Sequence, residues 1–156
     1  MIVLLHNIRS LYNVGSIFRT ADGAGIEKIY LCGITPEPFD RLGKPRPQFT
    51  KVSLGAEHFV PWEHVASTTA LVRRLKKEEY TIFAIEQAKH SVSHKSVKLE
   101  QKDLKKIAIV FGNEVRGLPP ALLKLADKVL EIPMNGEKES LNVGVAFGIV
   151  AYHLQK

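Results

Sequence analysis

The stretch that decides the fold lies between residues 107 and 154 and reads IAIVFGNEVRGLPPALLKLADKVLEIPMNGEKESLNVGVAFGIVAYHL. It opens with Ile107–Phe111, an apolar run rich in β-branched side chains, which is typical of a strand buried on both faces. A second strand is predicted at Lys128–Ile132. Each strand runs into a polar turn that contains glycine. If the strands are parallel, both turns lie at the edge of the sheet where open α/β proteins bind ligands; ordinary strand-to-helix turns are the alternative.

The end of this stretch predicts a helix that begins near Leu141. From Val143 to Val150 its residues are apolar nearly all round, which indicates burial on all sides. At roughly 14 residues the helix is shorter than the about 20 residues that a membrane span needs. Gly144 and Gly148 share one face, so another backbone can approach closely there, either within the chain or from a second subunit.

The composition indicates one globular domain that covers residues 1–156. Hydrophobic residues make up 45% of the chain and charged residues 24%, as is usual for a domain that buries a core. No charged N-terminal region precedes a long apolar segment, so we expect a cytoplasmic protein with no membrane partner. The single cysteine, Cys32, excludes an internal disulfide and is expected to be buried. The net charge of +6 favours a polyanionic partner.

The rest of the chain alternates between apolar runs and amphipathic segments. Strands are predicted at Met1–Leu5, Lys28–Cys32 and Thr81–Ile85, with a short extra strand at Val97–Leu99 and a strand or turn at Phe59–Trp62. Helices are predicted at about 14–24 and 67–79, the second capped by Ser67. Such alternation predicts an α/β fold with a mostly parallel sheet flanked by helices.

The first predicted helix carries one side chain that its packing does not explain. Asn13 is a good N-cap and Gly25 a good C-terminal stop. Helical spacing places the buried stripe at Val14, Ile17, Phe18 and Ala21. Arg19 lies off that stripe, so it points toward either a ligand or solvent.

A long irregular segment from Gly33 to about Pro47 carries the basic residues Arg41, Lys44 and Arg46. Loops of this length inside a compact domain are usually functional or disordered. A basic loop stiffened by prolines suits contact with phosphates, and a solvated surface loop is the alternative.

Several common sites are absent from the sequence. No G-x-G-x-x-G follows the first strand, and there is neither a P-loop nor a G-x-S-x-G nucleophile elbow. The histidines do not cluster with cysteines or carboxylates at metal-ligand spacing, so no metal site is expected. Three polar clusters remain, at residues 13–19, 112–117 and 133–142.

Through these clusters the chain resembles the SpoU/TrmH-type RNA 2′-O-ribose methyltransferases of the SPOUT superfamily. The first family motif resembles residues 7–21, NIRSLYNVGSIFRTA, and the second resembles residues 109–118, IVFGNEVRGL. The third resembles Ile132–Met134 together with Ser140–Val143. The resemblance covers essentially the whole chain, and it is to the minimal members that lack a separate N-terminal RNA-binding domain.

This resemblance implies a sheet whose C-terminal part is tied in a deep trefoil knot, and a homodimer formed through the first-motif helix and the last helix. The knot loops would bind S-adenosylmethionine. Matched residue by residue, the implied cofactor contacts are Ile85, Glu86, Gly112, Ile132, Met134, Ser140 and Leu141.

The implied reaction transfers a methyl group to a ribose 2′-hydroxyl of tRNA or rRNA. Arg19 matches an arginine proposed to help remove the hydroxyl proton. A guanidinium normally keeps its own proton, so fixing a phosphate or stabilising the developing alkoxide is the other role. The implied catalytic residues are Arg19, Asn13, Glu114, Ser140 and Asn142. The expected RNA contacts are Arg9, Arg41, Lys44, Arg46 and Arg116.

Two other functions are open at this point. A catalytically inactive RNA-binding module would keep the same fold, although retention of the motif residues speaks against it. An α/β enzyme acting on another small molecule, such as a nucleotide, is disfavoured by the missing glycine-rich fingerprints.

Overall fold

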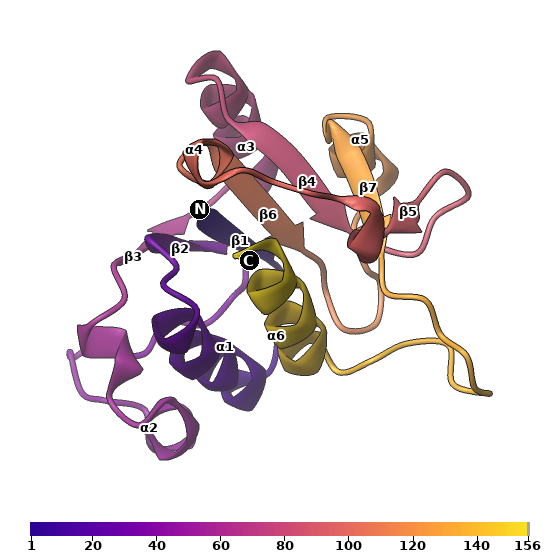
Figure 1. The fold of residues 1–156 in the computed structure, drawn as a ribbon. Helices are drawn as coiled ribbons and strands as arrows, with labels where there is room; N and C mark the ends of the chain where they lie inside the picture. The colour runs from indigo at the N-terminus through magenta and orange to yellow at the C-terminus, as the bar shows by residue number, and fades with distance from the viewer. Residues whose placement is uncertain (156) are drawn as a thin grey trace.

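Within residues 1–155, which the computed structural model describes, seven strands form one parallel sheet (Figure 1). The strands are β1 (Ile2–His6), β2 (Lys28–Cys32), β3 (Trp62–Val65), β4 (Thr81–Ile85), β5 (Val92–Ser93), β6 (Ile107–Phe111) and β7 (Lys128–Glu131). Their order across the sheet is β3-β2-β1-β6-β4-β7-β5, and every paired neighbour runs in the same direction. The predicted α/β fold with a parallel sheet is therefore confirmed.

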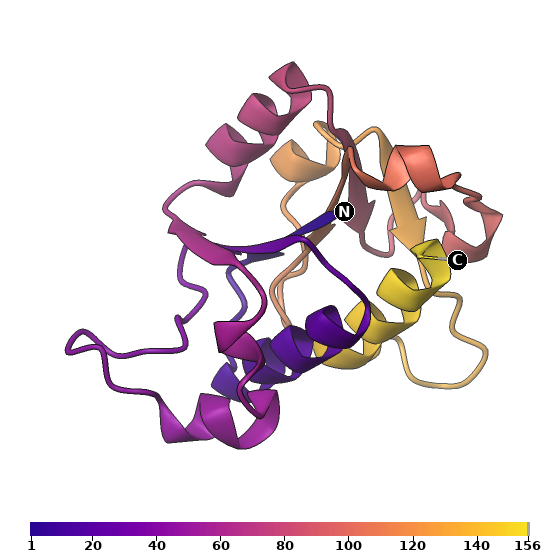
Figure 2. The ribbon, with the colours of Figure 1, turned by 60° about the vertical axis from the view of Figure 1, so that its left-hand side comes forward.

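Helices cover both faces of the sheet (Figures 1 and 2). The α-helices are α1 (Leu11–Gly23), α2 (Pro47–Ser53), α3 (Thr68–Lys77), α4 (Gln101–Leu104), α5 (Pro120–Leu123) and α6 (Val143–Leu154). Two short 3-10 helices, η1 (Ala56–His58) and η2 (His94–Ser96), lie in the connections. Helices α1, α2 and α6 pack on one face, and α3 and α5 pack on the other.

The central strand β1 shows why the sheet is covered on both sides. Successive side chains of a strand point to opposite faces. Val3 and Leu5 therefore enter the core beneath α1 and α6, while Ile2 and Leu4 enter the core beneath α3. Because all four are apolar and buried, each face needs a layer of helices.

Most predicted strands are confirmed, but the predicted cap of the first helix and one predicted strand are wrong. Helix α1 begins at Leu11 and is capped by Ser10, whose Oγ accepts the Asn13 backbone N–H at 3.3 Å. The earlier start lets Leu11 pack against the core, so Asn13 lies in the first turn and is not the cap. The extra strand predicted at Val97–Leu99 is also absent. Its apolar side chains pack onto the core as irregular chain, and β5 precedes it.

The last helix begins at Val143, and Asn142 caps it by accepting the Gly144 N–H at 2.8 Å. Burial on all sides was wrong for the single chain, since within Val143–Val150 the residues Val145 and Ile149 are 52% and 38% exposed. The glycine face instead packs within the chain: a Cβ added to Gly144 would lie 3.5 Å from Ser16 Oγ of α1. One face of α6 is therefore closely packed on α1, and the other is apolar and open.

The predicted burial of Cys32 is confirmed. This residue ends β2 and is fully buried, and its thiol contacts the Tyr30 carbonyl at 3.6 Å. Burial raises the pKa of the thiol to about 12, because a thiolate would lose its hydration there. Cys32 is a packing residue with a protonated side chain at neutral pH. No helix among residues 1–155 is long and apolar enough to cross a membrane.

Candidate active site

The loops that follow four neighbouring strands, β1, β6, β4 and β7, meet at the carboxyl edge of the sheet. Because β1, β6, β4 and β7 are parallel neighbours, their carboxyl ends face the same way. The loops after β1, β6 and β7 carry the three sequence motifs. This is the position that open α/β sheets use for ligands.

Glu114, in the turn after β6, holds the loop after β1. Its carboxylate accepts hydrogen bonds from the backbone N–H groups of Arg9 and Ser10, at 3.0 and 3.1 Å, and from Asn13 Nδ2 at 3.1 Å. Partial burial alone would raise the pKa of Glu114. The hydrogen bonds outweigh burial and place this pKa below its usual range, so the carboxylate is ionised at neutral pH.

Asn13 links Glu114 to the third motif. Its Oδ1 accepts a hydrogen bond from Asn142 Nδ2 at 2.9 Å, while Asn142 Oδ1 caps α6. Glu114, Asn13 and Asn142 thus form one chain of hydrogen bonds that links all three motifs. The early start of α1 places Asn13 in the first turn, where helical side chains tilt toward the N-terminus of the helix and so toward the loops of the other two motifs.

The turn after β6 depends on two glycines. Gly117 has a φ of +62°, and a Cβ there would overlap the carboxylate of Glu86. That carboxylate accepts the Leu118 N–H at 2.8 Å, which fastens the turn to the end of β4. A Cβ on Gly112 would overlap the Gly117 backbone. Only glycine therefore lets this turn close so tightly.

A cavity of about 530 Å³ lies between these loops. It is lined by every residue predicted to contact the cofactor, namely Ile85, Glu86, Gly112, Ile132, Met134, Ser140 and Leu141. Of the predicted catalytic residues, it is also lined by Asn13, Glu114, Ser140 and Asn142. The structure thus brings these residues to one place, with apolar walls and carboxylates among them.

Sequence reasoning missed further residues that line the cavity. They are Gln87, Phe111, Asn113, Val115, Gly117, Glu131, Val143 and Ala146. Each lies in or directly beside one of the segments that supply the predicted residues. Widening the predicted positions to the whole motif segments would have found Phe111, Asn113, Val115, Gly117 and Val143, which lie within residues 109–118 and 140–143.

Arg19 does not line this cavity. It is exposed on α1, which begins at the cavity and runs away from it. Arg9 and Arg116 line a second cavity, which lies at the same edge of the sheet. The predicted catalytic and RNA-contact residues are therefore not all gathered within one chain.

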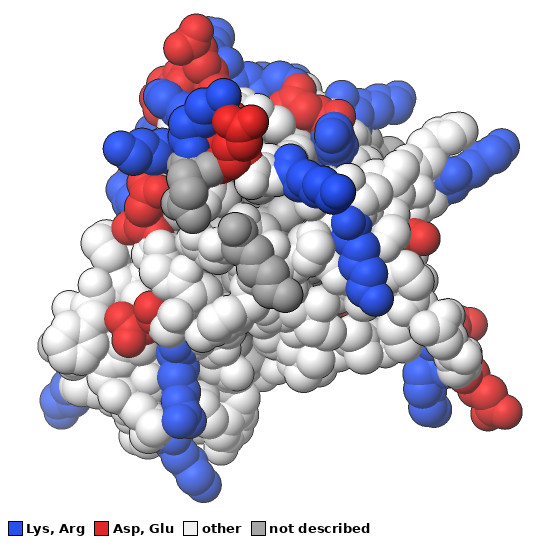
Figure 3. Space-filling model, in the orientation of Figure 1, with Lys and Arg blue, Asp and Glu red and all other residues white. Residues whose placement is uncertain are grey.

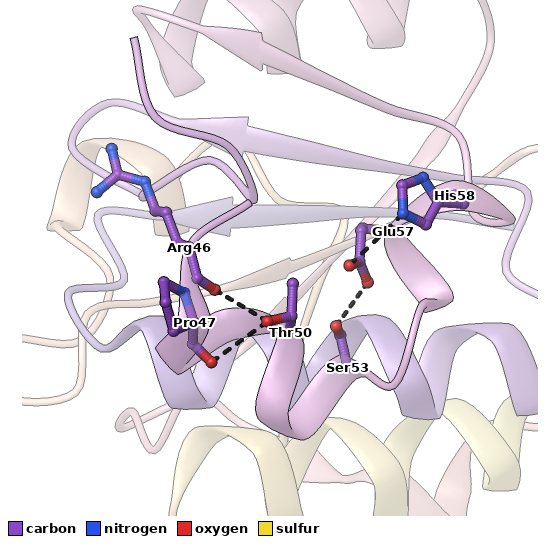
Figure 4. Close-up of polar contacts among 6 residues, drawn as sticks. All are labelled: Arg46, Pro47, Thr50, Ser53, Glu57 and His58. Carbon is purple, nitrogen blue, oxygen red and sulfur yellow. Dashed lines mark hydrogen bonds and ion pairs between the residues drawn. The ribbon is translucent and has the colours of Figure 1, made fainter. Parts of the chain in front are cut away.

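The other predicted RNA contacts lie on the connection between β2 and α2. Asp40 Oδ1 accepts the backbone N–H groups of Leu42 and Lys44, at 2.8 and 2.9 Å, which closes a tight loop. Arg46 Nε donates to Phe39 O at 3.3 Å, so Arg46 partly serves to hold the loop. Figure 4 shows the Arg46 guanidinium extending away from the start of α2.

Beyond this loop, α2 and η1 form a compact support. Thr50 Oγ1 donates to the carbonyl groups of Arg46 and Pro47, each at 3.3 Å, and Ser53 Oγ donates to the buried carboxylate of Glu57 at 2.5 Å (Figure 4). The exposed cations Arg41 and Lys44 therefore project from an ordered base.

The fold and the site together define a class: α/β proteins with a parallel sheet whose motif loops enclose a ligand cavity at the carboxyl edge. A model of the SpoU rRNA Methylase family matches residues 1–152. The chain belongs to this family.

Curated relatives agree with that assignment. The chain is 30% identical over its whole length to the tRNA (guanosine(18)-2′-O)-methyltransferase of Aquifex aeolicus and covers 69% of that protein. It is 28% identical to the 23S rRNA (guanosine-2′-O-)-methyltransferase RlmB of Escherichia coli K12, with 97% of the chain matched to 58% of that protein. For several of these relatives, the chain spans less than two thirds of their length.

Solved structures show the same fold. The A. aeolicus TrmH/SpoU tRNA modifying enzyme has a TM-score of 0.81 at 31% identity, covering 99% of this chain and 73% of that one. The AdoMet-bound rRNA methyltransferase from Sinorhizobium meliloti has a TM-score of 0.85 at 30% identity, covering 97% of this chain and 54% of that one.

Proposed function

We propose that this chain is an S-adenosylmethionine-dependent RNA 2′-O-ribose methyltransferase. One observation carries the proposal: Glu114, Asn13 and Asn142, one from each family motif, join by hydrogen bonds around a single cavity. The named relatives act on guanosines of tRNA or rRNA. An inactive RNA-binding module would have no need for this cavity.

The cavity fits S-adenosylmethionine in size and chemistry. Its volume of about 530 Å³ lies in the usual range for small-molecule sites. Ile85, Ile132, Met134 and Leu141 supply apolar walls suited to the adenine ring. Acidic groups such as Glu131 suit a ligand that carries a sulfonium charge. We infer that Glu86, Gly112 and Ser140 complete the cofactor contacts.

The bound cofactor supplies an electrophilic methyl group, so the protein has to hold the ribose hydroxyl in line and manage its proton. Glu114 and Asn13 fix the loop that faces the ribose, and Asn142 with Ser140 borders it from the third motif. Arg19 binds the adjacent phosphate and stabilises the alkoxide that develops on the 2′-oxygen. That role needs no deprotonated guanidinium.

A homodimer would complete the site. The open face of α6 carries Val145, Ile149 and Tyr152, and Figure 3 shows little charge on the surface over this helix. Apolar exposure of this kind is typical of an interface. Arg19 projects from the neighbouring helix and is outside its own cavity, so we infer that pairing brings it to the cavity of the partner subunit.

We further propose that residues 1–156 act as one methyltransferase domain with a trefoil knot formed by the motif loops. Placement of the loops after β6 and β7 around one cavity supports the knot. The net charge of +6 supports an RNA substrate, with Arg41, Lys44 and Arg46 as phosphate contacts. A tRNA or rRNA substrate would place the protein in the cytoplasm.

The test is direct. Calorimetry should detect S-adenosylmethionine binding, light scattering should give the mass of a dimer, and mass spectrometry should find new 2′-O-methylnucleosides in RNA treated with enzyme and cofactor. RNA from cells that lack the gene is the substrate. Failure to bind the cofactor, or binding without any methylated product, would refute the proposed activity.

A further inference from the structure

A second cavity, of about 780 Å³, borders the first. Asn113, Val115 and Gly117 line both cavities, so the turn after β6 is a wall that the two share. A molecule in the second cavity would therefore lie directly beside the proposed methyl-transfer site. Arg9 and Arg116, which are expected to contact RNA, line this cavity, but no part of the RNA has yet been assigned to it.

The walls of the second cavity are fixed before any ligand binds. Asn7 has a φ of +53°, a backbone conformation that residues other than glycine rarely adopt. Its Oδ1 accepts the Ile34 N–H at 3.0 Å, and its carbonyl accepts Asn113 Nδ2 at 2.7 Å. These bonds join three loops, so the cavity does not depend on a ligand to form.

Two aliphatic side chains on these fixed walls are left open to solvent. Ile34 is 67% exposed and Val115 is 81% exposed, and both line the cavity. Single exposed apolar residues are common on protein surfaces. Here, however, both stand on hydrogen-bonded backbone at the rim of one cavity, since Val115 N–H donates to Asn113 Oδ1 at 2.9 Å. Such an arrangement suits a flat apolar ligand.

The charges around the cavity indicate what kind of flat ligand fits. Arg9 and Arg116 line it, and a guanidinium plane stacks on nucleobases and pairs with phosphates. Burial lowers the pKa of His6, so its ring adds no charge to the cavity at neutral pH. The lining thus combines aliphatic contacts with cations and contains no carboxylate side chain.

We propose that the second cavity binds an unstacked nucleobase of the RNA strand, next to the ribose that enters the first cavity. This inference rests on the proposed function, because it assigns the RNA its position at that site. Proteins read single-stranded RNA by stacking splayed bases on planar and apolar side chains. The base would lie against Ile34 and Val115, with Arg116 over it and Arg9 toward the backbone.

The first experiment separates base contacts from phosphate contacts. Two fluorescent probes are compared by anisotropy: a short single-stranded RNA of mixed sequence, and a ribose-phosphate strand of equal length without bases. Ile34→Ala should bind the RNA about tenfold more weakly than wild type and bind the abasic strand equally well. Its salt dependence should not change, because no charge is removed. Leu54→Ala, at a similarly exposed leucine outside the cavity, should match wild type on both probes.

A second variant tests the stacked guanidinium. Arg116→Lys keeps the positive charge and loses the plane, so it should weaken RNA binding and leave binding of the abasic strand unchanged. The proposal is overturned if Ile34→Ala binds RNA as wild type does, if it weakens both probes equally, or if Arg116→Lys keeps full RNA affinity. Because both side chains are exposed, thermal melting should confirm that the variants fold like wild type.

Cofactor binding distinguishes this proposal from the function on which it rests. Both variants should bind S-adenosylmethionine like wild type in calorimetry, since neither residue lines the first cavity. A wild-type protein that ignores the cofactor yet shows the base-dependent Ile34 effect would refute the methyltransferase and leave the base site standing. Normal methyl transfer with no base-dependent effect would refute the base site alone.

Discussion

Two loops at the same edge of the sheet are held in opposite ways. In the turn after β6, hydrogen bonds reach across the chain: Glu114 binds the backbone of Arg9, and Asn113 binds the carbonyl of Asn7. In the loop at residues 38–46, Asp40 accepts backbone N–H groups two and four residues away. The first loop therefore depends on hydrogen bonds across the fold in addition to its local ones, whereas the hydrogen bonds of the second come from its own segment.

This difference teaches where precision is needed. Methyl transfer requires the reacting atoms to be placed within a fraction of an ångström, and long-range bonds to a rigid sheet provide that. Phosphate contacts tolerate movement, because charge acts over several ångströms. We therefore expect changes in the turn after β6 to damage catalysis and changes in the basic loop to damage RNA affinity.

The largest effect is expected from a residue that belongs to neither loop. Arg19→Ala should lower methyl transfer to RNA by about a thousandfold, because the developing alkoxide would lose its cation. Affinity for S-adenosylmethionine, measured by calorimetry, should stay nearly the same. An equal loss of cofactor affinity would contradict the assigned role of Arg19.

Glu114→Gln tests the long-range loop directly. In the wild-type protein three donors share the Glu114 carboxylate, and a neutral amide with a single acceptor oxygen cannot accept from all of them. The value of kcat should therefore fall by about a hundredfold. Asp40→Asn is the matched control in the local loop and should leave kcat nearly unchanged. Similar losses of kcat from the two substitutions would contradict the proposed difference between the two loops.

Glu114 also predicts a dependence on pH. Folding lowers its pKa, so the stability that its carboxylate adds is complete above the ordinary pKa of a glutamate and is lost as the pH falls through the lower, folded-state value. Urea denaturation of wild type and Glu114→Gln should therefore differ at neutral pH and converge in acid. A difference that persists in acid would point to packing as the cause.

Gly117→Ala and Gly43→Ala compare the two loops in terms of stability. Both glycines have positive φ, +62° and +74°, so alanine costs each site about 1 kcal/mol of backbone strain. Only at Gly117 would the new Cβ also displace the Glu86 carboxylate and so break the hydrogen bond that it accepts from the Leu118 N–H, whereas nothing lies within 4 Å of a Cβ added to Gly43. Gly117→Ala should therefore lower the free energy of unfolding by about 2 kcal/mol or more, and Gly43→Ala by roughly half as much. Equal losses in urea denaturation would contradict the closed geometry of the turn.

The smallest effect is expected from Lys44→Ala. Removing one exposed cation of the basic loop should weaken RNA binding a few-fold and reduce the slope of log affinity against log salt by about 1. Cofactor affinity and stability should not change. Lys77→Ala, an exposed lysine at the end of α3, is the control and should have no effect on either quantity.

The fold could largely be predicted from the sequence because its strands are short apolar runs. The bounds predicted for β2, β4 and β6 are those of the structure, since each run begins and ends with a change in polarity. The wrong prediction of a strand at Val97–Leu99 shows the limit of this signal. Whether an apolar segment joins a sheet depends on a free neighbouring edge, which local sequence does not encode.

Sequence reasoning predicted which residues line the candidate site, but it did not predict the hydrogen bonds that arrange them. The motifs placed Asn13, Glu114 and Asn142 near one another, yet capping propensity wrongly assigned Asn13 the role of helix N-cap. Its hydrogen-bond partners are 101 and 129 residues away, beyond the reach of local patterns. For the same reason the exposed Ile34, which borders a cavity only when three loops meet, carried no signal in the sequence.

The buried thiol of Cys32 has a practical consequence. With its pKa raised to about 12 and its side chain enclosed, it should not react with maleimide dyes at neutral pH. Since the chain has no other cysteine, a change such as Leu42→Cys would create the single thiol that reacts with such dyes. A fluorophore attached there would report the approach of a partner molecule to that rim of the protein in real time.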